Sequence, residues 1–131
     1  MDKVKIACVG LGGWGKNILR VGSQIPAAEL RGICDTNPAV LQKFSSQFPT
    51  SKTYPSYDDL LKDKEIDAIL LATPAPQHFA MASAAIDAGK HVYVEKPMTL
   101  MVAEAESLVQ QAEAAGRTLM VGHLLEYHPA V

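Results

Sequence analysis

The chain has 131 residues, of which 48% are hydrophobic and 20% charged, the balance of an ordinary globular protein of about one domain. Twelve basic and fourteen acidic residues leave a net charge of −2, which gives no electrostatic basis for binding nucleic acid or an anionic membrane. No apolar run approaches the ~20 residues that a membrane-spanning helix needs, and the residues after Met1 lack the pattern of a secretory signal.

The first part of the chain alternates between strand and helix patterns. Residues 4–9 form a β-branched run that ends in glycines, which indicates a buried strand, and residues 14–21 follow with the apolar spacing of a helix. A second apolar run, residues 30–34, indicates another strand. Asn37 has the residue type of a helix N-cap, which predicts a helix over residues 38–48.

The middle of the chain continues this alternation. A weak strand is predicted near Thr53, before a short helix that Ser56 would cap. Residues 67–73 form a continuously apolar run, which is typical of a strand covered on both faces. The break at residues 74–76 leads into a helix predicted over residues 77–88.

The last predicted elements complete an α/β pattern. Residues 91–94 indicate a strand, Thr99 is expected to cap a long helix that ends at Gly116, and residues 118–121 indicate a final strand. Strands separated by single helices form right-handed βαβ units. We therefore expect one α/β domain built on a doubly wound parallel sheet, the Rossmann fold.

A glycine-rich turn joins the first predicted strand to the first predicted helix. Residues 10–15 read Gly-Leu-Gly-Gly-Trp-Gly and match GxGxxG in the strand-to-helix context that makes this pattern informative. Gly10 permits a tight turn, Gly12 lets the backbone approach a pyrophosphate, and Gly15 lets the helix pack on the strand. The N–H groups of the first helical turn would then face the phosphates, an arrangement that the helix dipole favours.

Asp35 lies twenty residues after Gly15, at the end of the second predicted strand. A dinucleotide site places a carboxylate there to accept hydrogen bonds from ribose hydroxyls. An ordinary surface turn followed by a helix-capping aspartate is the alternative. Against it, the strand, the glycines, the helix and the carboxylate follow one another as they do in a dinucleotide site. Because Asp35 would repel a 2′-phosphate and neither Thr36 nor Asn37 supplies a cation, we expect NAD rather than NADP.

Two further strand ends are followed by polar residues and by prolines, which restrict the main chain. Thr73 and Pro74 are followed by His78, and Glu95-Lys96-Pro97 follows the strand at residues 91–94. Taken alone, the Glu-Lys pair is also compatible with a solvated strand end, although the proline restricts the conformation of the lysine. Together with the glycine turn, these segments resemble the N-terminal domain of the glucose–fructose oxidoreductase / inositol dehydrogenase / MocA family.

The resemblance implies a nicotinamide dinucleotide cofactor and the oxidation of a secondary alcohol of a sugar or cyclitol, or the reverse reaction. It implies that Lys96 is the catalytic lysine, whose ammonium would hydrogen-bond the reacting hydroxyl and stabilise an alkoxide. Residues 14–17 and 122–130 further resemble members of the family that act on nucleotide sugars. Carried over to this sequence, the cofactor-binding residues are Gly10, Gly12, Gly13, Trp14, Gly15, Asp35, Thr73, Pro74, His78, Glu95 and Lys96, with Lys16 and Asn17 completing the phosphate-facing turn.

The resemblance also implies a second α/β domain that supplies most of the pocket for a carbohydrate substrate. We expect the dinucleotide domain over residues 1–122 and the start of a connection over residues 123–131, with His123 as a candidate substrate contact. The chain alone is then expected to bind NAD without turnover, and the full-length protein to form a homo-oligomer. A non-catalytic NAD-binding sensor or regulatory module is the alternative, because it needs the glycine turn and Asp35 but not Lys96.

The other reactive side chains indicate no metal site. Cys8 and Cys34 lie in apolar runs without CxxC spacing, and His123, Glu126 and His128 lack the i, i+4 spacing of a zinc pair. We therefore expect two buried thiols and no metal, which fits a cytoplasmic protein.

Overall fold

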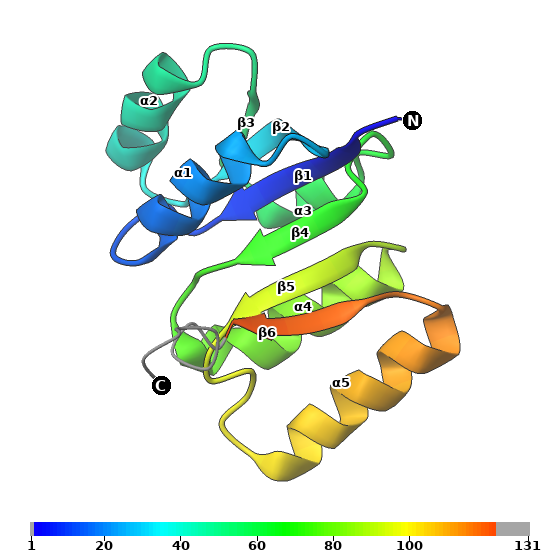
Figure 1. Cartoon of the computed structure of the whole chain (residues 1–131). Helices are drawn as coiled ribbons and strands as arrows, with labels where there is room; N and C mark the ends of the chain where they lie inside the picture. Colours follow the sequence, from blue (N-terminus) through cyan, green and yellow to red (C-terminus); the bar gives the residue numbers. More distant parts are fainter. Residues whose placement is uncertain (1, 123–131) are drawn as a thin grey trace, which may run out of the picture.

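The structure, a computed structural model, describes residues 2–122. These residues form a six-stranded sheet in which all neighbouring strands are parallel, in the order β3-β2-β1-β4-β5-β6 (Figure 1). The predicted doubly wound parallel sheet is confirmed. The strands are β1 (Val4–Val9), β2 (Ala28–Cys34), β3 (Lys52–Tyr54), β4 (Ala68–Leu71), β5 (His91–Glu95) and β6 (Leu119–Gly122). The helices are α1 (Gly15–Gln24), α2 (Pro38–Gln47), α3 (Tyr57–Leu61), the 3₁₀ turn η1 (Ala75–Gln77), α4 (His78–Asp87) and α5 (Val102–Ala115).

Helices cover both faces of the sheet (Figure 1). Because successive side chains of a strand point to opposite faces, neighbouring residues of β1 enter different hydrophobic clusters. Cys8 packs in a cluster with Leu19 of α1 and Leu41 of α2. Val9 packs in a larger cluster with residues of α3, α4 and α5, among them Ile86 of α4. The continuous apolar character of the central strands follows from this burial on both sides.

Two of the three predicted helix caps are confirmed. The Asn37 side chain accepts a hydrogen bond from the N–H of Ala39 at 3.0 Å, and the Ser56 hydroxyl accepts one from the N–H of Asp59 at 3.4 Å. The cap predicted at Thr99 is wrong. The Thr99 hydroxyl donates to the carbonyl oxygen of Met101 at 2.7 Å, and α5 begins only after that residue.

No helix within residues 2–122 is long and apolar enough to cross a bilayer. The predictions for residues 123–131, namely the connection to a second domain and the substrate contact at His123, lie outside the described residues.

Candidate functional site

The loops that follow β1, β2, β4 and β5 meet at the carboxyl edge of the sheet. The strand register places Val9 beside Cys34 on one side and beside Leu71 on the other, and Leu71 lies beside Val94. The residues directly after these strands therefore gather around the point between β1 and β4 where the strand order reverses. Open parallel sheets bind their ligands at this point.

The three glycines of the fingerprint have different structural roles. Gly10 has a φ of +86°, and a Cβ there would lie 2.8 Å from the carbonyl oxygen of Ala72. A Cβ at Gly15, the first residue of α1, would collide with the carbonyl oxygen of Gly10. A Cβ at Gly12 would meet no atom of the described chain within 4 Å. The fold thus requires glycine at positions 10 and 15, whereas Gly12 leaves open space in which a ligand can approach the backbone.

The Asp35 carboxylate is held by two backbone groups. Its Oδ2 accepts a hydrogen bond from the N–H of Leu11 in the glycine turn at 2.9 Å, and its Oδ1 accepts one from the N–H of Asn37 at 2.8 Å. Each carboxylate oxygen has a second lone pair, so both can accept a further hydrogen bond. The arrangement presents a fixed anionic acceptor beside the turn, which suits the hydroxyls of a ribose.

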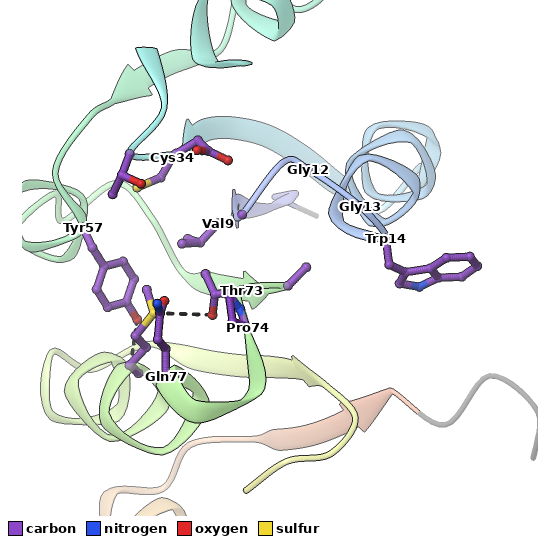
Figure 2. A pocket seen from close by; sticks show the side chains of 14 residues that line it. Val9, Gly12, Gly13, Trp14, Cys34, Tyr57, Thr73, Pro74 and Gln77 are labelled. Atoms are coloured by element: carbon purple, nitrogen blue, oxygen red, sulfur yellow. Dashed lines mark hydrogen bonds between the residues drawn. The ribbon is translucent and has the colours of Figure 1, made fainter. Parts of the chain in front are cut away.

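A cavity of about 550 Å³ opens between the glycine turn, Asp35 and the end of β4 (Figure 2). Figure 2 shows Tyr57 and Gln77 on the same side of this cavity as Thr73, whereas the indole of Trp14 points away from them. Trp14 is 51% exposed. The predicted residues that line the cavity are Gly10, Gly12, Gly13, Trp14, Asp35, Thr73 and Pro74.

Tyr57 and Met81 also line this cavity and were not predicted. The Tyr57 hydroxyl donates to the carbonyl oxygen of Met81 at 2.7 Å, and the Thr73 hydroxyl contacts the Met81 sulfur at 3.5 Å. Burial raises the pKa of Tyr57, so its hydroxyl stays protonated at neutral pH. No local motif marks these two residues, because the packing of α3 and α4 against the sheet brings them together.

Cys34 is a further wall of the same cavity, at the end of β2. Burial, followed by the charge of Asp35, raises the pKa of its thiol to about 12, and burial alone raises the pKa of Cys8 to about 12. Both are free and buried, as predicted. Because the thiolate is the reactive form, neither side chain is a nucleophile at neutral pH.

A second cavity of about 460 Å³ adjoins the first, since Trp14, Ala72 and Thr73 line both. Its other walls include the predicted residues His78, Glu95 and Lys96, so it joins the segment after β4 to the end of β5 and the residue that follows it. Lys96 is exposed, and no salt bridge joins its ammonium to another residue of the described chain. A cation is therefore available at the mouth of this cavity.

Glu95 is oriented by its neighbours on β5 and β6. The Tyr93 hydroxyl donates to Glu95 Oε1 at 2.8 Å. Gly122 lies opposite Glu95 in the strand register, and a Cβ at Gly122 would collide with the Tyr93 hydroxyl and lie 2.8 Å from Glu95 Oε1. Only glycine at position 122 leaves room for this hydrogen bond. The sequence signal was a glycine at a strand end, which was not interpreted in this way.

Asn17 lies apart from the two cavities. It lines an apolar hollow on the face of the sheet beside α1, together with Val21, Leu70 and Met120. Its expected place in the phosphate-facing turn is therefore not seen. Among residues 2–122, no three His, Cys, Asp or Glu side chains gather closely enough to hold a metal ion.

Comparison with known proteins agrees with this geometry. Residues 4–123 match the family model described as "Oxidoreductase family, NAD-binding Rossmann fold". A UDP-N-acetylglucosamine 3-dehydrogenase of Acidithiobacillus ferrooxidans is 31% identical over 131 residues, which are 100% of this chain and 40% of that protein. A glycosyl hydrolase family 109 protein of Shewanella pealeana is 32% identical over 137 residues, which cover 97% of this chain and 30% of that protein. The chain thus spans less than half the length of these two relatives.

A solved structure shows the same arrangement of elements. Scyllo-inositol dehydrogenase from Lactobacillus casei, with bound NAD(H) and scyllo-inositol, superposes with a TM-score of 0.89 and 26% sequence identity. The match covers 98% of this chain and 38% of that one.

Proposed function

The chain belongs to the oxidoreductase family with the NAD-binding Rossmann fold, and we propose that it is the cofactor domain of an enzyme that moves a hydride between a carbohydrate and NAD. The substrate group would be a secondary alcohol of a sugar, cyclitol or nucleotide sugar. One observation carries the proposal: the fixed carboxylate, the open space at Gly12 and the available Lys96 ammonium line two adjoining cavities at one edge of the sheet.

The residues present fit a dinucleotide. Asp35 would accept hydrogen bonds from the ribose next to the adenine, and the space beside Gly12 at the start of α1 would receive the pyrophosphate. The second cavity, between Thr73 and Lys96, would receive the nicotinamide end. The carboxylate of Asp35 favours NAD over NADP, because a 2′-phosphate on that ribose would bring a second anion beside it.

Lys96 would act on the substrate oxygen. The bound nicotinamide ring supplies the hydride acceptor for oxidation or the hydride donor for reduction. In the oxidation, the alcohol carbon loses a hydride and its oxygen loses a proton as the carbonyl forms. The Lys96 ammonium would hydrogen-bond that oxygen and stabilise the negative charge that develops on it. Glu95, held by Tyr93, lies next to this lysine and is proposed to contact the cofactor ribose.

The activity of the whole protein depends on more than these residues. The chain spans less than half the length of the two relatives described above. We therefore propose that a second domain holds most of the substrate and accepts the proton that the substrate hydroxyl loses. The chain alone would then bind NAD without turnover, and the complete protein would act as a cytoplasmic homo-oligomer. A non-catalytic NAD-binding module is less well supported, because such a module has no use for Lys96 at the cavity mouth.

The test combines binding and turnover. The purified chain is titrated with NADH, and the protein that joins this chain to its second domain is assayed for NADH formation from NAD⁺ with scyllo-inositol and UDP-N-acetylglucosamine. Saturable NADH binding and NADH formation with a compound of this class would support the proposal. Release of sugar from an aryl glycoside without oxidation of any free alcohol would instead assign glycosidic-bond cleavage.

A further inference from the structure

His78 is the first residue of α4, and its imidazole is buried between two strand ends. The residue is 1% exposed. Its Nδ1 lies 2.7 Å from the carbonyl oxygen of Pro97, and its Nε2 lies 2.6 Å from the carbonyl oxygen of Thr73. One ring therefore spans the segment after β4 and the segment after β5. Residues of both segments line the second cavity, and so does His78 itself.

The chemistry of these contacts determines what the ring can do. A carbonyl oxygen only accepts hydrogen bonds, so a ring nitrogen must carry a proton to bond to it. The neutral imidazole has one N–H and donates to one of the two carbonyls, whereas the doubly protonated ring donates to both. In either case both ring nitrogens face main-chain oxygens. The His78 side chain has no ring nitrogen left for a cofactor or a substrate.

We infer that His78 is a positioning residue that fixes the Lys96-Pro97 segment against Thr73 and so sets the shape of the nicotinamide end of the site. This inference rests on the proposed function, because it takes the second cavity as the nicotinamide site. The Pro97 carbonyl belongs to the residue directly after Lys96, so with a proton on Nδ1 the ring holds the main chain beside the lysine. The contact of Nε2 with the carbonyl oxygen of Thr73 places the ring against the segment that follows β4.

Two ligands separate this role from a general effect on folding. NADH contains the nicotinamide end, and ADP-ribose lacks it, so the ratio of their dissociation constants reports on the second cavity alone. Replacing His78 by leucine removes both ring-nitrogen contacts and puts an apolar side chain in their place. We expect His78→Leu to weaken NADH binding by roughly three- to tenfold, the value of one or two lost hydrogen bonds, and to leave ADP-ribose binding within about twofold of wild type.

Two conservative variants identify which bond matters. The asparagine amide nitrogen reaches about as far as Nδ1, so His78→Asn can retain the bond to Pro97. The glutamine amide nitrogen reaches about as far as Nε2, so His78→Gln can retain only the bond to Thr73. We expect His78→Asn to restore the ratio of NADH to ADP-ribose affinity and His78→Gln to restore little of it.

His91 provides the control. Its Nδ1 accepts a hydrogen bond from the N–H of Thr118 at 3.0 Å, at the opposite end of β5. His91→Leu therefore removes a histidine hydrogen bond to the main chain away from both cavities. Thermal unfolding of every variant is measured beside the titrations. We expect His91→Leu to change stability without changing the affinity ratio.

The outcomes are distinguishable. If wild type binds neither NADH nor ADP-ribose, the proposed function itself fails. If wild type binds both and His78→Leu keeps the wild-type ratio, only the role of His78 fails. Equal dissociation constants of NADH and ADP-ribose in wild type would also overturn the inference, because the second cavity would then not hold the nicotinamide. If the ratio of the two dissociation constants instead changes in proportion to the melting temperature across all the variants, His78 has only a structural role and the inference fails.

Discussion

The N–H of Leu11 donates a 2.9 Å hydrogen bond to the carboxylate of Asp35, and this bond joins the glycine turn to the end of β2. The pyrophosphate and ribose parts of the candidate site are therefore fixed relative to each other before any ligand arrives. A preorganised site avoids the entropy cost of ordering its groups on binding. The same bond gives Asp35 a structural role in addition to the recognition role proposed for it.

The first prediction concerns cofactor choice. Asp35→Asn removes the charge but keeps an oxygen that can accept one of the two backbone hydrogen bonds. We expect it to weaken NAD binding by about tenfold, as for a lost hydrogen bond to a charged group, and to weaken NADP binding less because the repulsion also disappears. Titration with both cofactors measures the change, with the exposed Asp59→Asn on α3 as control. An unchanged preference would place the ribose elsewhere.

The second prediction separates two glycines of one motif. Gly12→Val places its side chain in open space, so we expect the stability to stay within about 0.5 kcal/mol of wild type while NADH binding is lost. Gly15→Ala places a methyl group against the carbonyl oxygen of Gly10, and we expect a loss of about 2 kcal/mol or more. Denaturant unfolding and NADH titration measure both variants. Normal NADH binding by Gly12→Val would refute the location of the pyrophosphate.

These glycines also show what could be predicted from the sequence. The fingerprint, the carboxylate at position 35 and the apolar strands are local patterns, and each has a direct structural cause in the turn, the register or the burial. The caps at Asn37 and Ser56 were predictable for the same reason. The start of α5 was not, because the main chain bends repeatedly over residues 96–101 and becomes helical only after Met101, which overrides the preference of Thr99 for a cap.

The remaining parts of the site depend on contacts between distant segments. Tyr57 meets Met81 across twenty-four residues, and His78 meets Pro97 across nineteen. Spacing along one element cannot reveal such pairs, since they arise only when helices pack on the sheet. The sequence therefore predicts which strand ends carry the candidate site but not which contacts position its side chains.

The third prediction is a pH dependence of stability away from the site. Asp63 accepts hydrogen bonds from the Tyr54 hydroxyl and, at 2.9 Å, from the N–H of Glu65, and the Tyr54 bond is the main cause that holds the pKa of this carboxyl below its ordinary value. The folded protein thus favours the ionised form. This contribution is present above the unfolded pKa of about 3.9 and is lost as the pH falls through the lower folded pKa.

Asp63→Asn tests this dependence. We expect it to lower the free energy of unfolding by about 1–3 kcal/mol at pH 7, and the difference from wild type should shrink below about pH 3.9. Asp59→Asn is again the matched control. Denaturant unfolding over this pH range measures the effect, and a difference that stays constant down to the lowest pH would contradict the role of the ionised carboxylate.

The fourth prediction concerns the thiols. With a pKa of about 12, Cys34 has about one thiolate in 10⁴ molecules at pH 8, so iodoacetamide should label the folded chain far more slowly than the unfolded chain. Cys8, whose thiol pKa is also raised to about 12, should behave alike. Mass spectrometry of labelled peptides measures both rates. Rapid labelling of Cys34 in the folded chain would show that this wall of the cavity opens to solvent.

The central claim is that Lys96 acts in hydride transfer, and turnover by Lys96→Met in the protein that includes the second domain tests it most directly. Methionine keeps the apolar stem of the side chain and removes the ammonium. We expect kcat for NADH formation to fall by about 10²–10⁴, the usual contribution of a general acid–base group, while the dissociation constant of NAD changes little. A kcat close to that of wild type would contradict the claim and would leave Lys96 as a solvated strand end in an NAD-binding domain.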